Sequence, residues 1–188
     1  VLGMSSNRNM ALDTFRQVAF TIEDNQFLKD QVRQIRLANG QESISLLNGA
    51  RYEIAAATRD APRGKTADFL YIDELREWTE EAFTAALPTT RARPNAMTFM
   101  TSNAGDGFST VLNDLRERCL SYPPDNLGFY EYSAPQHSKI NDRKAWAMAN
   151  PALGHLITEQ TLEESVSTNS IEATKTEMLC MWVDSAVS

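Results

Sequence analysis

The sequence has no long apolar run and no obvious export signal. No window approaches the roughly 18 consecutive apolar residues that span a membrane. The opening stretch, VLGMSSNRNM, lacks the basic start and apolar middle of a signal peptide. It also lacks an initiator methionine, which is consistent with a piece of a longer chain. We therefore expect no membrane partner.

Cysteine, histidine and basic residues are also scarce. Cys119 and Cys180 are far apart and form no CxxC pair, so we expect free thiols in a reducing cytoplasm. His137 and His155 lie in different segments without a further ligand at metal spacing, which argues against a zinc site. The net charge of -7 argues against a uniformly basic surface that coats nucleic acid, although a local basic patch stays possible.

The 188 residues, 42% of them hydrophobic, suffice for one globular domain with a substantial core. VLGMSS predicts a short strand, with Ser5 or Ser6 as the N-cap of the helix that follows. Residues 27–35 predict a second helix or an irregular turn, and Asn48-Gly49 predicts a β-hairpin. Further strands are expected at 69–72, 97–101 and 129–132, and helices at 77–87, 109–120, 142–149, 159–166 and 171–183.

Two buried strands separated by a helix predict a βαβ unit, and hence a parallel sheet. Polar residues follow both strands directly: Asp73 and Glu74 after the first, and Thr101, Ser102 and Asn103 after the second. In parallel sheets, ligands bind beyond the carboxyl ends of the strands. These residues are therefore candidates for a functional site.

The chemistry of such a site follows from its side chains. Asp73 could hold a hydrated Mg²⁺, and Glu74 could polarise a water molecule for attack on a phosphate. Thr101, Ser102 and Asn103 offer neutral donors that could sense a γ-phosphate. The alternative is structural, because Asp73 and Glu74 could equally be an N-capping pair for the helix expected at 77–87.

A basic loop, TRDAPRGKTAD, precedes the first of these strands. Arg63 lies before the flexible Gly64 and could present its planar guanidinium to a phosphate. The alternative is that Arg59, Arg63 and Lys65 are simply solvated.

Several segments together resemble the large subunit of tailed-phage terminases, the motors that package DNA into capsids. APRGKTADFLYIDELREW resembles the region around their Walker B motif, and TFMTSNAGDGFSTVLNDLRERC resembles their coupling strand and the helix after it. FYEYSAPQ, NDRKAWAMANPALG and TEMLCMWVDS are similar to the lid region and the linker toward the nuclease domain. SSNRNMALDTFRQV is similar to the strand-to-helix segment that follows the P-loop helix, so the resemblance spans nearly the whole chain.

The resemblance implies a P-loop NTPase-like α/β fold, with a mostly parallel sheet flanked by helices. Residues 1–133 would be a partial ATPase core, and 134–188 a helical lid and linker region leading to a nuclease domain that the chain does not contain. Asp73 would be the magnesium-side acid and Glu74 the catalytic base. Arg63 would be an arginine finger acting in trans, and Thr101, Ser102 and Asn103 the coupling motif.

The implied activity is ATP hydrolysis that drives double-stranded DNA into a viral capsid, with ATP and Mg²⁺ as cofactors. The implied partners are DNA, a ring of identical subunits, the portal protein and the terminase small subunit. The expected location is the host cytoplasm, with transient docking on the procapsid.

Two departures from the family pattern leave alternatives open. No P-loop is present: RGKT at 63–66 has the right ending but lacks the upstream glycine and a following helix, so we interpret it as a chance match. The chain also ends before any nuclease-type acidic cluster. One alternative is a helicase-like DNA translocase, which should show further basic motifs after the coupling strand. The other is a non-catalytic module for ring assembly or capsid docking, favoured by the missing P-loop and the acidic charge.

Overall fold

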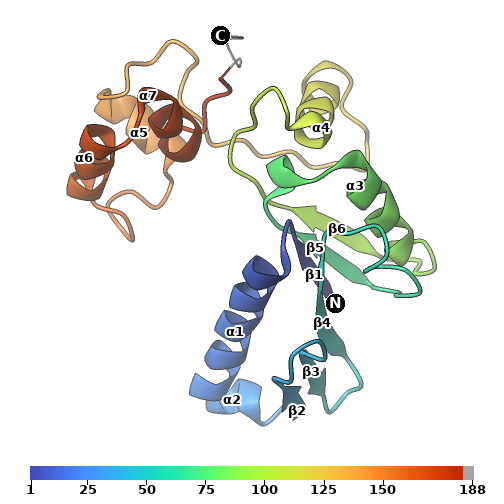
Figure 1. Cartoon of the computed structure of the whole chain (residues 1–188). Helices are drawn as coiled ribbons and strands as arrows, with labels where there is room; N and C mark the ends of the chain where they lie inside the picture. The colour runs from blue at the N-terminus through green and yellow to red at the C-terminus, as the bar shows by residue number, and fades with distance from the viewer. Residues whose placement is uncertain (184–188) are drawn as a thin grey trace. The chain divides into compact units, whose positions relative to one another are not determined.

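The computed structural model describes residues 1–183, which fall into two compact units that divide between Ser102 and Asn103 (Figure 1). The first unit holds all the strands of the described chain, and the second is built from helices and loops. The first unit consists of β1 (Leu2–Ser5), α1 (Arg8–Asp24), α2 (Gln26–Lys29), β2 (Val32–Arg36), β3 (Ser43–Leu46), β4 (Arg51–Ala56), β5 (Phe69–Ile72), η1 (Leu75–Glu77), α3 (Glu80–Ala86), η2 (Leu87–Thr90) and β6 (Met97–Met100).

The strands of the first unit form one six-stranded sheet in the order β2-β3-β4-β1-β5-β6. β4, β1, β5 and β6 are parallel to one another, and β2 and β3 join as antiparallel strands at one end. Helices lie on both faces of this mostly parallel sheet (Figure 1). The α/β fold expected from the sequence is therefore confirmed.

The centre of the sheet is buried because its short strands carry apolar residues on the covered face. Leu2 and Met4 of β1 pair with Leu70 and Ile72 of β5, and all four side chains are almost fully buried. The alternate residues of β5, Phe69 and Tyr71, are only half-buried, so one face of the strand is covered more fully than the other. The packing of this core determines where β5 ends along the sheet, and therefore where Asp73 lies.

α1 packs its apolar stripe against β1 and β4, with the Phe15 ring 5.6 Å from the ring of Tyr52. The expected N-cap at Ser5 or Ser6 is wrong. β1 continues through Ser5, which pairs with β4, so the helix begins later and Asn7 caps it by accepting a hydrogen bond from the Met10 N–H. The pairing of β1 with β4 keeps Ser5 in the strand, and so determines which residue caps the helix.

Replacing Phe15 should destabilise the first unit strongly. Its side chain is fully buried, and Phe15→Ala should lower the free energy of unfolding by about 3–5 kcal/mol, because the ring's transfer energy is lost and a cavity remains. Phe20→Ala on the same helix is the control, since Phe20 is 69% exposed and should change the stability by no more than about 0.5 kcal/mol. Urea unfolding followed by circular dichroism measures both; equal losses would contradict this packing.

The hairpin at Asn48-Gly49 is confirmed between the antiparallel strands β3 and β4. Gly49 takes the positive φ of +87° that the turn requires, and the Asn48 side chain accepts a hydrogen bond from the Ala50 N–H. The expectation for 27–35 is only partly right. A one-turn helix, α2, is followed by the strand β2, whose register is irregular between Val32 and Gln34, so the sequence shows no clean alternation there.

The helix expected at 77–87 is shorter than predicted. The chain forms the 3₁₀ turn η1, then α3, then the 3₁₀ turn η2, which has a proline in its first turn. Thr79 caps α3 by accepting a hydrogen bond from the Ala82 N–H. A separate turn therefore lies between Glu74 and the start of α3.

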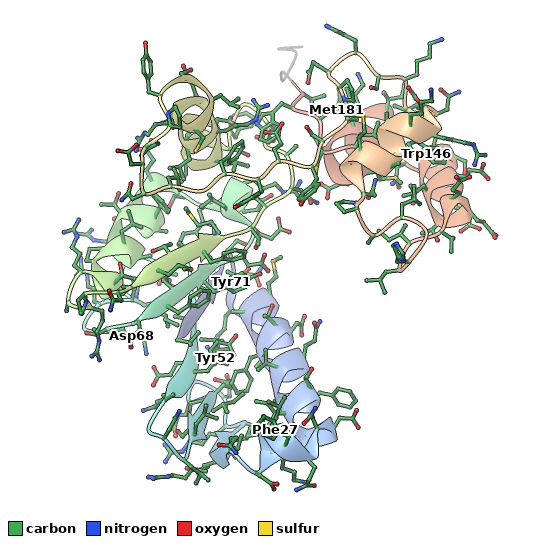
Figure 2. All side chains as sticks on the ribbon, turned by 180° about the vertical axis from the view of Figure 1, so that it is seen from behind. Phe27, Tyr52, Asp68, Tyr71, Trp146 and Met181 are labelled. Carbon is green, nitrogen blue, oxygen red and sulfur yellow. The ribbon has the colours of Figure 1, made fainter. Side chains whose placement is uncertain are left out.

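The second unit contains α4 (Thr110–Ser121), α5 (Arg143–Ala149), α6 (Glu159–Thr168), α7 (Ile171–Ala173) and the π-helix η3 (Thr174–Met178). Its core gathers around Trp146, which packs with Leu162, Leu179 and Met181 (Figure 2). The Trp146 indole N–H also donates to the Ile140 carbonyl at 2.7 Å. This small core holds residues from 134 to 181 together.

Two expectations for the second unit are wrong. Residues 129–132 form no strand. Tyr130 is 85% exposed there, and Glu131 instead accepts two hydrogen bonds from Arg116. The helix expected at 171–183 ends at Met178 as a π-helix. Beyond it Cys180 has a positive φ of 47°, which does not fit a right-handed helix.

Within residues 1–183 no helix is both long and apolar enough to cross a membrane. Cys119 and Cys180 form no disulfide with each other. In the same range no three metal-ligating side chains gather into a site.

Candidate active site

The end of β5 is held firmly at the carboxyl edge of the sheet. The Asp73 N–H donates to the Met4 carbonyl of β1 at 2.9 Å. The Asp73 carbonyl accepts a hydrogen bond from the indole N–H of the buried Trp78 at 3.0 Å. Strand pairing on one side and a turn on the other therefore fix the backbone that carries the acidic pair.

One oxygen of the Asp73 carboxylate is fully engaged. Its Oδ1 accepts hydrogen bonds from the Thr101 hydroxyl at 2.8 Å and from the Glu74 N–H at 3.0 Å. The described residues give Oδ2 no hydrogen bond. The Asp73 carboxylate is thus oriented through Oδ1, whereas Oδ2 remains available to a ligand.

The register of the sheet explains why Thr101 reaches Asp73. Ile72 pairs with Met100 in the parallel ladder, so the next residues along the two strands, Asp73 and Thr101, are neighbours. Tyr71 lies on the same face as Asp73 because residues two apart on a strand share a face. Its hydroxyl is 3.1 Å from the Thr101 hydroxyl. Burial raises the pKa of the Tyr71 phenol above its ordinary value, and the nearby Asp73 carboxylate adds to that rise.

Glu74 has a left-handed backbone, with φ 53° and ψ 50°. A non-glycine residue in this region typically costs about 1–3 kcal/mol and persists only where the surroundings impose it. The following N–H groups supply that constraint, since Leu75 donates to the Thr101 carbonyl at 3.1 Å and Arg76 donates to the Ser102 hydroxyl at 3.0 Å. Backbone strain of this kind is enriched at functional sites.

The Glu74 side chain lies beside a cation. The Arg76 Nε is 3.2 Å from Glu74 Oε2 and 3.4 Å from Glu77 Oε1. Only about a quarter of the Glu74 side chain is exposed, at 24%. The second acid is therefore partly screened from solvent and held by an arginine on the turn that follows.

The helix-capping interpretation of Asp73 and Glu74 is wrong. Thr79, not either acid, caps α3, and Glu74 makes no side-chain capping bond to η1. The Asp73 carboxylate bonds to the neighbouring strand instead. The acidic pair consequently needs another explanation than helix capping.

The structure brings together four of the six residues expected at the site. Asp73, Glu74, Thr101 and Ser102 meet at the carboxyl edge through the bonds above. Asn103 belongs to the second unit, where its amide N–H donates to Glu177 at 2.9 Å and its oxygen contacts the Cys180 thiol at 3.9 Å.

Arg63 lies in the long loop between β4 and β5, and it forms an exposed ion pair with Asp60 at 3.1 Å. The loop and α3 line an open pocket of about 790 Å³, to which Arg59, Arg63 and Lys65 contribute together with Glu80 and Glu81. Lys65 is anchored by Glu53 at 2.7 Å, and this hydrogen bond lowers the pKa of the Glu53 carboxyl. Neither Asp73 nor Glu74 lines the pocket.

The RGKT sequence at 63–66 has no P-loop structure. Gly64, with a φ of +76°, lies in a turn, and the chain runs from Thr66 into β5 without forming a helix. A Walker-type phosphate loop needs a following helix whose first N–H groups face the phosphates. The interpretation of RGKT as a chance match is confirmed.

The free oxygen of Asp73 fits a magnesium site of one particular kind. Mg²⁺ in phosphoryl-transfer proteins is typically bound through one or two carboxylates and the substrate's phosphates, with water in the remaining positions. Oδ2 of Asp73 is such a carboxylate oxygen, and its direction is fixed by the bonds to Oδ1. The donor set therefore suits magnesium bound together with a phosphate ligand.

Three residues that contact the acidic pair were missed at the sequence level: Tyr71, Arg76 and Trp78. Tyr71 could have been found, because the two-residue period of a strand places it on the face of Asp73. The contacts of Arg76 and Trp78 depend on the left-handed turn at Glu74, which no local sequence signal indicates.

The fold and this edge define an α/β domain of the kind found in phage large terminases. The large terminase of bacteriophage HK97 superimposes with a TM-score of 0.85 at 19% identity, over 96% of this chain and 39% of that one. Two structures of the large terminase from a thermophilic bacteriophage match with TM-scores of 0.64 and 0.59, at 13% and 15% identity, over 97% of this chain and 40% of theirs. The second of these is a complex with ADP.

The family described as terminase large subunit, T4likevirus-type, N-terminal, matches residues 2–188, and the chain belongs to this family. No curated protein sequence matches it. The chain spans about two-fifths of the length of the solved large terminases that it resembles.

Proposed function

We propose that this chain forms the part of a DNA-packaging ATPase that supplies the acidic residues for ATP hydrolysis. Membership of the terminase family makes this the function to test, and an ADP complex of a structural relative is consistent with it. The observation that carries the proposal is the Asp73 carboxylate, oriented through Oδ1 by Thr101 and by the Glu74 N–H while Oδ2 is left open.

Each acid has a distinct role in this proposal. Asp73 holds Mg²⁺ through Oδ2, and the bound ion would neutralise charge on the phosphates. Glu74 acts as the general base: its carboxylate accepts a proton from the water that attacks the γ-phosphate. The chain leaves the strand conformation at Glu74, whose backbone is left-handed, and the two neighbouring acids would serve different atoms.

The remaining residues act around this pair. Thr101, Ser102 and Asn103 couple the state of the γ-phosphate to movement. The first two bond directly to Asp73 or to the backbone after Glu74, whereas Asn103 begins the second unit. Arg63 acts in trans on the nucleotide of a neighbouring subunit, in keeping with its absence from the group around Asp73.

The wider function that we propose is the one typical of the family. Hydrolysis would drive double-stranded DNA into a viral capsid, in a ring of identical subunits that docks on the portal protein and works with the terminase small subunit in the host cytoplasm. Residues 1–133 would serve as the ATPase core and 134–188 as the lid and linker toward a nuclease domain. This functional division differs from the division of the structure into compact units after Ser102.

Asp73→Asn in the full-length protein should lower ATP turnover by about 100-fold or more, because the metal loses its charged ligand. Asp68→Asn is the matched control. Asp68 lies just before β5, with a 74% exposed side chain paired only with Arg93 among the described residues, and its substitution should leave turnover within about twofold. The measurement is steady-state ATP turnover across a range of Mg²⁺ concentrations.

If Asp73→Asn retained wild-type turnover, the catalytic proposal would fail. The non-catalytic alternative, a module for ring assembly or capsid docking, would then explain the family membership better. The helicase-like alternative receives no support from the family match.

A further inference from the structure

A chain of hydroxyl groups links the aromatic face of the sheet to Asp73. The Tyr71 hydroxyl lies 3.1 Å from the Thr101 hydroxyl, which lies 2.8 Å from Asp73 Oδ1. Tyr71 belongs to β5, and Thr101 directly follows β6. Two neighbouring strands therefore meet through side chains at the point where the acidic pair begins.

The direction of these hydrogen bonds is determined by chemistry. A carboxylate can only accept, so Thr101 donates its single hydroxyl proton to Asp73. With that proton committed, the Thr101 oxygen can only accept from Tyr71. The Tyr71 hydroxyl is also near enough to the Asp73 carboxylate to interact with it directly. The threonine hydroxyl is a rotor that can turn to other acceptors. The donation from Tyr71 favours the rotation that faces Asp73.

The Tyr71 ring is itself held in place. Phe99 of β6 packs against it with ring centroids 6.2 Å apart and planes at 25°, and Phe69 stacks on the same Phe99 at 6.4 Å. Such ring contacts favour a particular orientation of the Tyr71 ring, and hence of its phenol oxygen. Figure 2 shows Tyr71 on the sheet.

We propose that Tyr71 is a positioning residue for the metal-side acid. Through Thr101 it fixes the rotation of the Asp73 carboxylate, so that Oδ1 is held by the protein and Oδ2 is left for a metal–nucleotide ligand. This inference rests on the proposed function, in which Asp73 holds Mg²⁺. Tyr71 belongs neither to the acidic pair Asp73 and Glu74 nor to the polar residues 101–103 after β6.

Binding of Mn²⁺ to the ADP-saturated, full-length protein tests the proposal, with free Mn²⁺ quantified by electron paramagnetic resonance. Tyr71→Phe keeps the ring and removes the donor, and it should weaken Mn²⁺ binding about 5- to 10-fold. ADP affinity without metal should not change. Tyr52→Phe is the matched control: the Tyr52 hydroxyl makes no hydrogen bond among the described residues, and its loss should leave Mn²⁺ binding unchanged.

A double-mutant cycle then tests the route through Thr101. In a Thr101→Val background the hydroxyl between Tyr71 and Asp73 is missing, so Tyr71→Phe should cause a much smaller further loss of Mn²⁺ affinity than it does in the wild type. An equal loss in both backgrounds would overturn the role of Thr101 as the link. Thermal unfolding of each variant shows whether a loss reflects unfolding instead.

Asp73→Asn separates this proposal from the one on which it rests. If Asp73→Asn weakens Mn²⁺ binding and Tyr71→Phe does not, the role of Tyr71 is wrong and the metal-side acid stands. If Asp73→Asn leaves Mn²⁺ binding at the wild-type level, the metal role of Asp73 fails, and the role of Tyr71 fails with it.

Discussion

Glu74→Gln in the full-length protein should bind ATP with nearly wild-type affinity and hydrolyse it about 10²- to 10⁴-fold more slowly. Glutamine has the shape of glutamate and can occupy the same left-handed turn. It is not a base, however, and cannot take a proton from the attacking water. The measurements are nucleotide affinity by fluorescence titration and turnover by phosphate release.

Glu77→Gln is the matched control for this variant. Glu77 contacts the same arginine, Arg76, at 3.4 Å, and its side chain is more exposed than that of Glu74, at 58% against 24%. Turnover in this control should stay within about twofold of wild type, because exposed pairs contribute little. Similar turnover in both variants and the wild type would remove Glu74 from the mechanism.

Arg63→Ala should lower hydrolysis about 10³-fold or more, but only in assembled rings, because the guanidinium serves the nucleotide of a neighbour. Its ion pair with Asp60 is exposed, with side-chain exposures of 61% and 80%, so Arg63 can leave that partner at small cost. Mixing the variant with Glu74→Gln subunits should restore part of the activity, since each kind supplies what the other lacks.

Arg59→Ala provides the comparison for Arg63. Arg59 lines the same pocket and is paired with Glu81 at 3.4 Å, with a similarly exposed side chain. We assign it no role in hydrolysis and expect near-normal turnover. The effect of Arg63→Ala should be measured both in the monomer and in the assembled ring. An equal loss of ATP hydrolysis in the two would contradict a role in trans.

Much of the first unit could be predicted because its signals are local. The apolar run at 69–72 forms the buried strand β5, and Asn48-Gly49 forms the hairpin between β3 and β4. The side-by-side placement of the polar residues after β5 and β6 also follows from parallel pairing. These features need only short-range periodicity and turn chemistry.

The errors arose where distant contacts decide the local structure. β2 was missed because its pairing with β3 forms it despite a poor alternation. Residues 129–132 have the aromatic composition of a strand, but no neighbouring strand pairs with them in the described chain. The N-cap of α1 lies at Asn7, since β1 holds Ser5 within the sheet.

The residues of the candidate site could be predicted from the sequence, but their backbone conformation and contacts could not. The sequence identified Asp73, Glu74, Thr101 and Ser102. It could not show that Glu74 adopts a left-handed backbone, because that conformation depends on hydrogen bonds from residues 75 and 76 to residues 101 and 102. The same turn brings Arg76 to Glu74.

The most direct test of the account is the position of a metal bound with nucleotide. Crystals of the full-length protein with ADP and Mn²⁺ give that position by anomalous scattering. We expect the ion beside Oδ2 of Asp73, either bound directly at about 2 Å or through one water. A nucleotide and ion bound elsewhere, for example in the pocket between the basic loop and α3, would contradict the assignment of the carboxyl edge as the active site.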